Sequence, residues 1–242
     1  TRFPGLSKAS RTPRGTAADE RGECAPEVSG PEYGLGGIYD ERASGRVFRR
    51  LGTHRKDGCS GEGRQVMRQA VEAGFRRAVP GEIRIDPFER IGSGWMLVTA
   101  GPPESWNTMT ASWGGLGHLW NRDVCFVFVR PQRHTRGFMD RNELFTVSFF
   151  GGEHRPALEF CGSHSGRDCD KAAETGLTPF EPLRGCVAFE QSLIVLAARK
   201  LYIHDMAAEG FLEEAPLSLY PSSDFHRMYI GGIEEALIRD GI

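Results

Sequence analysis

Three polar segments stand beside predicted strands, and together they could bind a phosphate group. Residues 107–113 offer hydroxyl groups and an amide, and residues 130–135 carry two guanidinium groups at the end of a strand. Residues 161–171 add an arginine and a lysine in a flexible loop. A phosphate dianion that leaves water needs several such charge-assisted donors. The segments therefore predict an anion site, which any phosphomonoester would satisfy.

Motifs for other chemistries are missing or misplaced. The glycines at 34–37 lie in a segment without periodicity and those at 92–94 precede a strand, so neither fits a dinucleotide-binding fingerprint. There is no triphosphate-binding loop and no His-Glu-x-x-His, and in residues 162–166 the serines flank a histidine where a nucleophile elbow needs a central serine. Cys161, His164 and Cys169 could begin a metal knuckle, but a fourth ligand at motif spacing is missing. Buried apolar roles are favoured for these cysteines, and no metal is expected.

The elements that must position the polar segments are mainly short strands. Runs rich in β-branched and aromatic residues predict strands at 95–100, 107–113, 124–129, 144–150, 186–189, 193–202 and 226–231, the last reaching 238 where its pattern continues. Residues 114–117 are expected to form a loop because three of the four are glycine. Short helices are predicted at 134–142, 155–160 and 170–175, the last ending at Gly176. Many strands with few short helices favour a mainly β fold, an antiparallel barrel that is closed or split.

The first 66 residues differ from the rest of the chain. They are dominated by glycine, arginine, serine, proline and acidic residues, without a sustained period of either strand or helix. Met67 is the first methionine and opens the first stretch of helical propensity. We therefore expect residues 1–66 to be a low-order extension outside the functional fold, and residues 67–242 to form one domain.

Composition narrows the class of protein. The 242 residues are 39% hydrophobic and 26% charged, which is typical of a water-soluble domain. The formal net charge of −2 gives no global attraction to nucleic acid or to an anionic membrane. The longest apolar run, residues 193–198, is far shorter than the roughly 20 residues that span a bilayer. Without a secretory signal pattern or regularly spaced cysteines, a cytoplasmic location and reduced thiols are expected.

Five blocks of the sequence resemble a known family. The three polar segments, with residues 144–150 and 225–231, are similar in order and content to blocks of the flavin reductase-like family, in particular its flavoredoxin-like members. The similarity spans about residues 87–238, while Cys169, Gly232 and the N-terminal extension depart from the family pattern. The resemblance implies an FMN-binding split barrel that forms a homodimer, with FMN near the subunit interface.

The resemblance also implies which residues bind FMN. In the first polar segment the flavin ring edge and the ribityl phosphate would be contacted by Asn107, Thr108, Met109, Thr110, Ser112 and Trp113. In the second the phosphate would be held by Arg130, Arg133 and Thr135. In the third a loop would close over the cofactor with Ser165, Gly166, Arg167 and Lys171, the last two balancing negative charge near the flavin. His226 would come from the last block.

Each assignment has a plainer alternative. The polar residues of 107–113 could satisfy their own backbone, and the arginines could be a solvated strand end. Trp113 could pack instead of stacking on the ring, and Tyr229, a further candidate of the last block beside His226, could belong to the core. Asp168 and Asp170 are left out of the site because they could pair with nearby cations or cap the next helix.

The implied activity is that of an FMN-dependent oxidoreductase. As an NAD(P)H-dependent flavin reductase, the protein would align a reduced nicotinamide with flavin N5 for hydride transfer, which needs no catalytic triad. No catalytic residue is therefore assigned. The alternatives are a flavoredoxin-type electron-transfer protein reduced by a protein partner, and a non-catalytic FMN-binding module.

Overall fold

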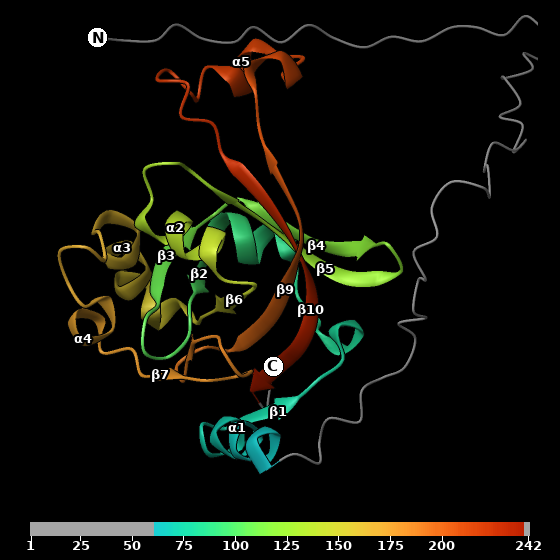
Figure 1. Cartoon of the computed structure of the whole chain (residues 1–242), viewed down its shortest axis with the longest axis vertical. Coiled ribbons are helices and arrows are strands. Elements are labelled where there is room, and N and C mark those ends of the chain that lie inside the picture. The colour runs from blue at the N-terminus through green and yellow to red at the C-terminus, as the bar shows by residue number, and fades with distance from the viewer. Residues whose placement is uncertain (1–60, 240–242) are drawn as a thin grey trace, which may run out of the picture. The chain divides into compact units, whose positions relative to one another are not determined.

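The structure is a computed structural model that describes residues 61–239 (Figure 1). Its strands are β1 (Phe75–Arg77), β2 (Met96–Ala100), β3 (Asn107–Ala111), β4 (Gly114–Leu119), β5 (Arg122–Val129), β6 (Leu144–Phe149), β7 (Pro179–Phe180), β8 (Ala188–Phe189), β9 (Ile194–Asp205) and β10 (Arg227–Arg239). Its helices are α1 (Gly61–Glu72), α2 (His134–Arg141), α3 (Arg155–Ser163), α4 (Lys171–Thr175) and α5 (Glu214–Leu217). Shorter helical turns cover Pro80–Glu82, Phe88–Ser93, Gly152–His154 and Ala208–Gly210. None of these helices is long and apolar enough to cross a membrane.

One antiparallel sheet forms the body of the fold. Its strands follow the order β3-β2-β6-β9-β10-β5-β4, and β1 pairs with the far end of β10. The two outer strands, β3 and β4, are consecutive in the chain and are joined by Ser112 and Trp113, but within residues 61–239 no strand pairing connects them. The sheet is therefore open between β3 and β4, and the predicted antiparallel split barrel with short helices is confirmed.

Alternating side chains place the main core inside the sheet. On β6, Phe145, Val147 and Phe149 point into a core that also receives residues of β2, β3, β5, β9 and β10. The intervening Thr146 points outward, where its hydroxyl donates to the Val187 carbonyl at 2.5 Å. This period of two is what a sheet with one face on a core requires. Burial of large apolar side chains on that face supplies most of the driving force for this part of the fold.

Helices and short strands cover the outer face. Leu97 of β2 packs with Leu158 and Cys161 of α3 and with Phe189 of β8. Further along the sheet, Phe75 of β1 stacks on Phe180 of β7 with ring centroids 5.4 Å apart, beside α1. Helix α1 begins at Gly61, before Met67, so the last residues of the expected extension are helical. The domain boundary at Met67 stays a prediction. The greater part of the expected extension, residues 1–60, lies outside the described residues.

The expected loop at 114–117 is wrong. These residues open β4, which pairs with β5 from Gly114 to Leu119. Glycine fits here because of a close approach: a Cβ on Gly114 would lie 2.6 Å from the Phe126 carbonyl oxygen and 2.7 Å from Cε of Met96. The strand then turns through Trp120 and Asn121, whose φ angles of 52° and 55° are those of a type I′ hairpin turn.

Strands β9 and β10 extend beyond the rest of the sheet. β6 pairs with β9 only as far as Arg199, whereas β9 continues to Asp205 alongside β10. β9 thus ends three residues beyond the predicted strand at 193–202. Residues 206–226, here called the β9–β10 connection, include α5 at the end of the two strands (Figure 1). Through residues 219–226 the connection returns to the end of β5, where it contacts Arg130.

Candidate functional site

The three predicted polar segments meet around β3, α2 and α3. Asn107, the first residue of β3, donates from Nδ2 to Oγ1 of Thr135 in the first turn of α2, at 2.7 Å. Arg133, just before α2, donates from Nη1 to the Gly162 carbonyl at the end of α3. Segments far apart in the sequence are therefore brought to one place by direct side-chain contacts.

The side chains of β3 divide between the core and the outer face. Met109 lies in the barrel core and is 4% exposed, so its side chain does not face the polar segments. On the outer face, the hydroxyl of Thr108 lies 2.8 Å from that of Thr99, and the hydroxyl of Thr110 donates to the Leu158 carbonyl. These two hydroxyls satisfy groups of the fold itself, as the plainer alternative expects. What β3 still offers a ligand is its amide backbone and the residues that follow it.

The two arginines of the second segment have different surroundings. Arg130 donates to Asp224 at 2.6 Å and to the Leu219 carbonyl at 3.0 Å, and its guanidinium lies 4.9 Å from the centre of the Tyr220 ring. Arg133, by contrast, forms no ion pair with any acidic side chain in residues 61–239. Burial, and then repulsion from Arg130, lowers the pKa of Arg133. Arg133 is thus the cation of this pair that a bound anion could neutralise.

The loop between α3 and α4 is compact. The hydroxyl of Ser165 accepts from the Arg167 amide at 3.2 Å, and the Ser165 carbonyl accepts from the Asp168 amide at 3.0 Å. Gly166 packs directly on Asn107, because a Cβ there would collide with the amide oxygen of that residue. Arg167 is exposed. The loop therefore presents hydroxyl, amide and guanidinium donors next to the start of β3.

Lys171 is not in a flexible loop, and this part of the prediction is wrong. It is the first residue of α4, only 5% exposed, and its ammonium donates to the carbonyls of Thr108 and Cys161, each at 2.8 Å. Asp170 caps the same helix by accepting from two backbone amides, as one of its two alternatives expects. Burial lowers the pKa of Lys171, and no acidic side chain of the described chain pairs with it. Lys171 connects β3 to α3 and leaves a positive charge inside the site.

The sum of these charges makes the site electropositive. His134 at the start of α2 has a lowered pKa because of burial and because Arg167, Arg141 and Lys171 repel its charged form. Asp168 opposes this effect only in part. A cluster of cations with few carboxylates leaves positive charge uncompensated, so the arrangement suits an anionic ligand.

At the opening of the sheet, Trp113 and His226 lie against each other. Trp113 is 42% exposed and its ring centre is 4.9 Å from that of His226, which is 8% exposed. Nδ1 of His226 lies 2.7 Å from the hydroxyl of Tyr220. Burial and the nearby Arg130 lower the pKa of His226 to about 4. A neutral imidazole next to an accessible indole could contact a planar ligand at the opening.

Sequence reasoning missed the contribution of the β9–β10 connection. Tyr220 and Asp224, which contact His226 and Arg130, lie in a stretch without strand or helix periodicity. The one available signal was the clustering of aromatic residues at 211, 220 and 225, whose rings pack within 6 Å of one another.

The low pKa of His226 predicts an acid-sensitive contribution to stability. The unfolded state binds a proton near the ordinary histidine pKa of 6.5, whereas the folded state resists protonation down to about pH 4. Stability from this residue is therefore complete above the unfolded pKa and is lost as the pH falls toward 4. Between pH 7 and pH 5, wild type should lose about 1 to 2 kcal/mol relative to His226→Leu. Chemical denaturation at both pH values measures this, with the exposed His204→Leu as the control, and equal losses in wild type and His226→Leu would contradict it.

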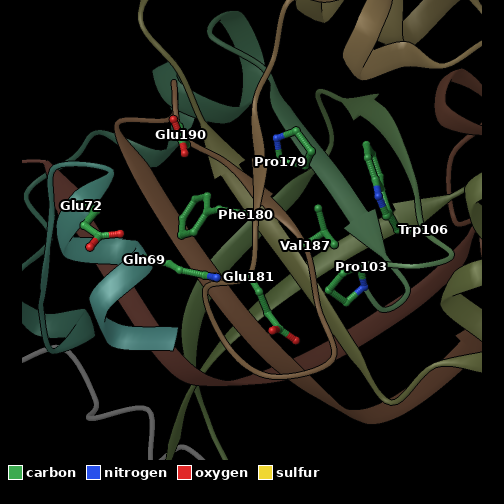
Figure 2. Close-up of a pocket in the computed structure, with 9 residues that line it drawn as sticks. All are labelled: Gln69, Glu72, Pro103, Trp106, Pro179, Phe180, Glu181, Val187 and Glu190. Carbon is green, nitrogen blue, oxygen red and sulfur yellow. The ribbon is translucent and has the colours of Figure 1, made fainter. Parts of the chain in front are cut away.

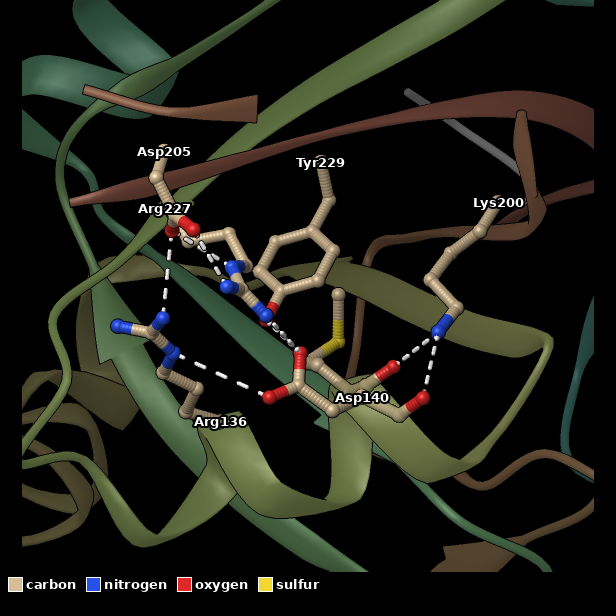
Figure 3. A network of polar contacts seen from close by, with 7 residues as sticks. Arg136, Asp140, Lys200, Asp205, Arg227 and Tyr229 are labelled. Atoms are coloured by element: carbon tan, nitrogen blue, oxygen red, sulfur yellow. Dashed lines mark hydrogen bonds and ion pairs between the residues drawn. The ribbon is translucent and has the colours of Figure 1, made fainter. Parts of the chain in front are cut away.

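Helix α2 is held against the barrel by a polar network around Asp140 (Figure 3). The Asp140 carboxylate accepts from the Tyr229 hydroxyl at 2.6 Å and from Arg227 at 3.1 Å, and Arg136 lies 3.9 Å away. Tyr229 is fully buried, which confirms the interpretation that it belongs to the core, and its pKa is raised by burial and by this carboxylate. Asp140 thus joins the last turn of α2 to β10.

Two further contacts complete the network in Figure 3. Asp205 at the end of β9 pairs with Arg227 at 2.5 Å and with Arg136 at 3.2 Å. Lys200 donates to the main-chain carbonyls of Met139 and Asp140, where a cation suits the end of a helix. The network holds the last turn of α2 through Asp140 and its first turn through Arg136, and that first turn also carries Thr135 and adjoins Arg133.

A separate pocket of about 460 Å³ lies between α1, the β2–β3 turn and β7 (Figure 2). It is lined by Gln69, Glu72, Pro103, Trp106, Pro179, Phe180, Glu181, Val187 and Glu190. Its three carboxylates would repel a phosphate, and it includes none of the predicted site residues. The pocket is therefore not the anion site.

The thiols and acidic groups form no metal centre in the part of the chain described. In residues 61–239 no group of three or more histidine, cysteine, aspartate or glutamate side chains could hold a metal ion. Cys125, Cys161, Cys169 and Cys186 form no disulfide among the described residues, while Cys24 and Cys59 lie outside them. Burial raises the pKa of Cys161 to about 11, so this thiol stays protonated.

Residues 88–241 match the family model described as the flavin reductase like domain. Among solved structures, an FMN-binding protein from Thermus thermophilus with bound p-hydroxybenzaldehyde is similar, with 21% identity, a TM-score of 0.49, and coverage of 68% of this chain and 79% of that one. A flavoredoxin from Methanosarcina acetivorans has 17% identity, a TM-score of 0.47, and coverage of 68% and 76%. The styrene monooxygenase flavin reductase from Pseudomonas putida S12 has 13% identity, a TM-score of 0.45, and coverage of 61% and 80%. No curated protein sequence matches the chain.

Proposed function

The chain belongs to the flavin reductase like domain family, and we propose that it binds FMN and works as an NAD(P)H-dependent flavin reductase. The family match at 88–241 confirms the resemblance drawn from the sequence, which spans about residues 87–238. The observation that carries the proposal is the half-buried guanidinium of Arg133, which has no carboxylate partner in the described chain and lies beside a donor-rich loop.

The donors present fit the phosphate of FMN. Arg133, Arg167 and the Ser165 hydroxyl can donate to a dianion, and Lys171 adds a positive charge to the same cluster. Gly166 lets the loop backbone pack directly on Asn107, which keeps the donors of the loop next to the start of β3. Arg130 remains paired with Asp224, so in this proposal it acts through its charge more than through direct donation.

The ring of the cofactor would lie at the opening of the sheet. Ser112 and Trp113 lie between β3 and β4 at that opening, and His226 lies against Trp113. Trp113 is exposed enough to cover a planar ligand and so exclude water from it. His226 is neutral at pH 7 and can offer a hydrogen bond without adding charge.

In this scheme the protein supplies alignment and electrostatics. When bound, FMN supplies the chemistry of two-electron hydride acceptance. Arg133, Arg167 and Lys171 stabilise added negative charge, which favours reduction. The same proposal includes a homodimer and a cytoplasmic location, with either NADH or NADPH as the hydride donor.

The visible spectrum of the purified chain tests the proposal. After reconstitution with FMN and removal of oxygen, the flavin band should bleach within seconds of adding NADH or NADPH. Bleaching by dithionite but not by either nicotinamide would contradict the reductase and favour electron transfer from a protein partner. A chain that retains no FMN at all would contradict cofactor binding itself.

A further inference from the structure

We propose that Tyr220 is a positioning residue that fixes the tautomer of His226, so that Nε2 carries the imidazole proton and donates to an acceptor atom of the bound cofactor. The identity of that acceptor rests on the proposed function, since it requires FMN at the opening of the sheet. The tautomer itself does not, because it follows from contacts within the chain.

Tyr220 is held firmly enough to orient its neighbour. Its hydroxyl lies 2.7 Å from Nδ1 of His226, and the side chain is 6% exposed. The ring packs on Phe225, with centroids 5.0 Å apart, and the Arg130 guanidinium lies 4.9 Å from its centre. Arg130 is in turn fixed by Asp224. The phenol is therefore restrained by its own segment and by the end of β5.

The number of protons decides the direction of this hydrogen bond. A neutral imidazole has one N–H and the phenol has one O–H, so either the phenol donates to Nδ1 or Nδ1–H donates to the phenol. In the second arrangement the buried phenol hydrogen would have no partner in the described chain, which is costly. In the first, the free N–H is Nε2. In the described chain, the fully buried side-chain polar atoms that lack a hydrogen-bond partner are the hydroxyls of Ser148 and Ser192. Nε2 of His226 also lacks a partner but is not one of these buried atoms, so it is not enclosed. The first arrangement is therefore favoured.

Nε2 then becomes a hydrogen-bond donor for a ligand at the opening of the sheet. The ring of His226 lies against the accessible Trp113, which joins β3 to β4 at the opening. The charged and titratable groups that act on His226 are Arg130, Asp224 and Arg133, together with Tyr220 at Nδ1. No hydrogen bond to Nε2 exists among the described residues. The donor is thus held in place before a ligand arrives.

Nitrogen-detected NMR of the ligand-free protein tests the tautomer. With ¹⁵N-labelled histidine at pH 7, the wild-type signal assigned through His226→Leu should show a protonated Nε2 and an unprotonated Nδ1. In Tyr220→Phe, which keeps the ring but removes the hydroxyl, the same signals should shift toward averaged values of the two tautomers. A proton on Nδ1 in wild type, or an unchanged signal in Tyr220→Phe, would overturn the proposal.

FMN titration tests the consequence for binding. Tyr220→Phe should bind FMN about threefold to tenfold more weakly, the loss expected for one misoriented hydrogen bond. In a His226→Leu background the same change should have no effect on affinity, because Tyr220 acts through the histidine. Tyr202→Phe, which removes an exposed hydroxyl from β9, is the matched control. An equal loss with and without His226 would overturn the positioning role. If neither the wild type nor any variant bound FMN, the proposed function would fail. The NMR experiment would still determine the tautomer of His226.

Discussion

Replacing Arg133 by methionine is expected to weaken FMN binding by about tenfold to a hundredfold and to leave riboflavin binding nearly unchanged. Methionine keeps much of the side-chain volume but removes the charge-assisted donors. Because Arg133 has no carboxylate partner within residues 61–239, its charge is available to a phosphate, and riboflavin lacks that group. Titration of the ligand-free protein with each flavin, followed by fluorescence, measures both affinities under one condition.

Arg130→Met is the matched comparison, because it removes a guanidinium three residues away. Arg130 already donates to Asp224 and to the Leu219 carbonyl, so its loss should cost less FMN affinity than the loss of Arg133. Arg84→Met controls for a general loss of positive charge, because this exposed arginine forms, among residues 61–239, a hydrogen bond to the Gly81 carbonyl and no other. If Arg133→Met weakened FMN and riboflavin equally, Arg133 would act by holding the Gly162 carbonyl and not by binding phosphate.

The strands inside the barrel were predictable because their burial follows a simple pattern. β5 and β6 are rich in β-branched and aromatic residues, and both appear close to their expected limits. β4 was missed for a physical reason. A run of glycines normally indicates a loop, but Gly114 is required here by the approach of the Phe126 backbone, which no local pattern reveals.

The site was predictable as a set of segments but not as a set of contacts. The sequence predicted that residues 107–113, 130–135 and 161–171 form one site. In the structure these segments are linked by Asn107, Arg133 and Lys171. It could not distinguish Arg130 from Arg133, because the difference is made by Asp224, nearly a hundred residues further along the chain. Partners that come from an irregular segment carry no periodic signal.

Helix α2 shows the same limit at a larger scale. Its limits were predicted to within a residue, and its place on the barrel depends on Asp140, Arg227 and Asp205. Such ion pairs join residues that are distant in sequence, and their chemistry is that of ordinary surface charges until the fold brings them together. Secondary structure is encoded locally here, whereas the orientation of the site is encoded by long-range polar contacts.

Lys171→Met is expected to lower the free energy of unfolding by about 2 kcal/mol or more, because the Cys161 carbonyl loses its side-chain donor and the Thr108 carbonyl keeps only the longer bond from the Asn107 amide, at 3.3 Å. The ammonium holds the Thr108 carbonyl of β3 and the Cys161 carbonyl of α3, and both residues are buried. Thermal and urea denaturation measure the loss. The matched control is Lys200→Met. Lys200 of β9 also donates to two main-chain carbonyls, those at the end of α2, but it is only half-buried. That change should cost about 1 kcal/mol.

The pH dependence separates this role from a purely steric one. Burial lowers the pKa of Lys171 from the ordinary 10.5, so the unfolded state binds more protons than the folded state in the range just below that value. Stability contributed by wild-type Lys171 must therefore rise as the pH increases through that range, and methionine cannot contribute it. The difference in unfolding free energy between wild type and Lys171→Met should grow from pH 7 toward pH 10. A difference that stayed constant, or a loss no larger than that of Lys200→Met, would mean that the lysine fills space at the junction of β3 and α3 and that its buried charge does not shape the site.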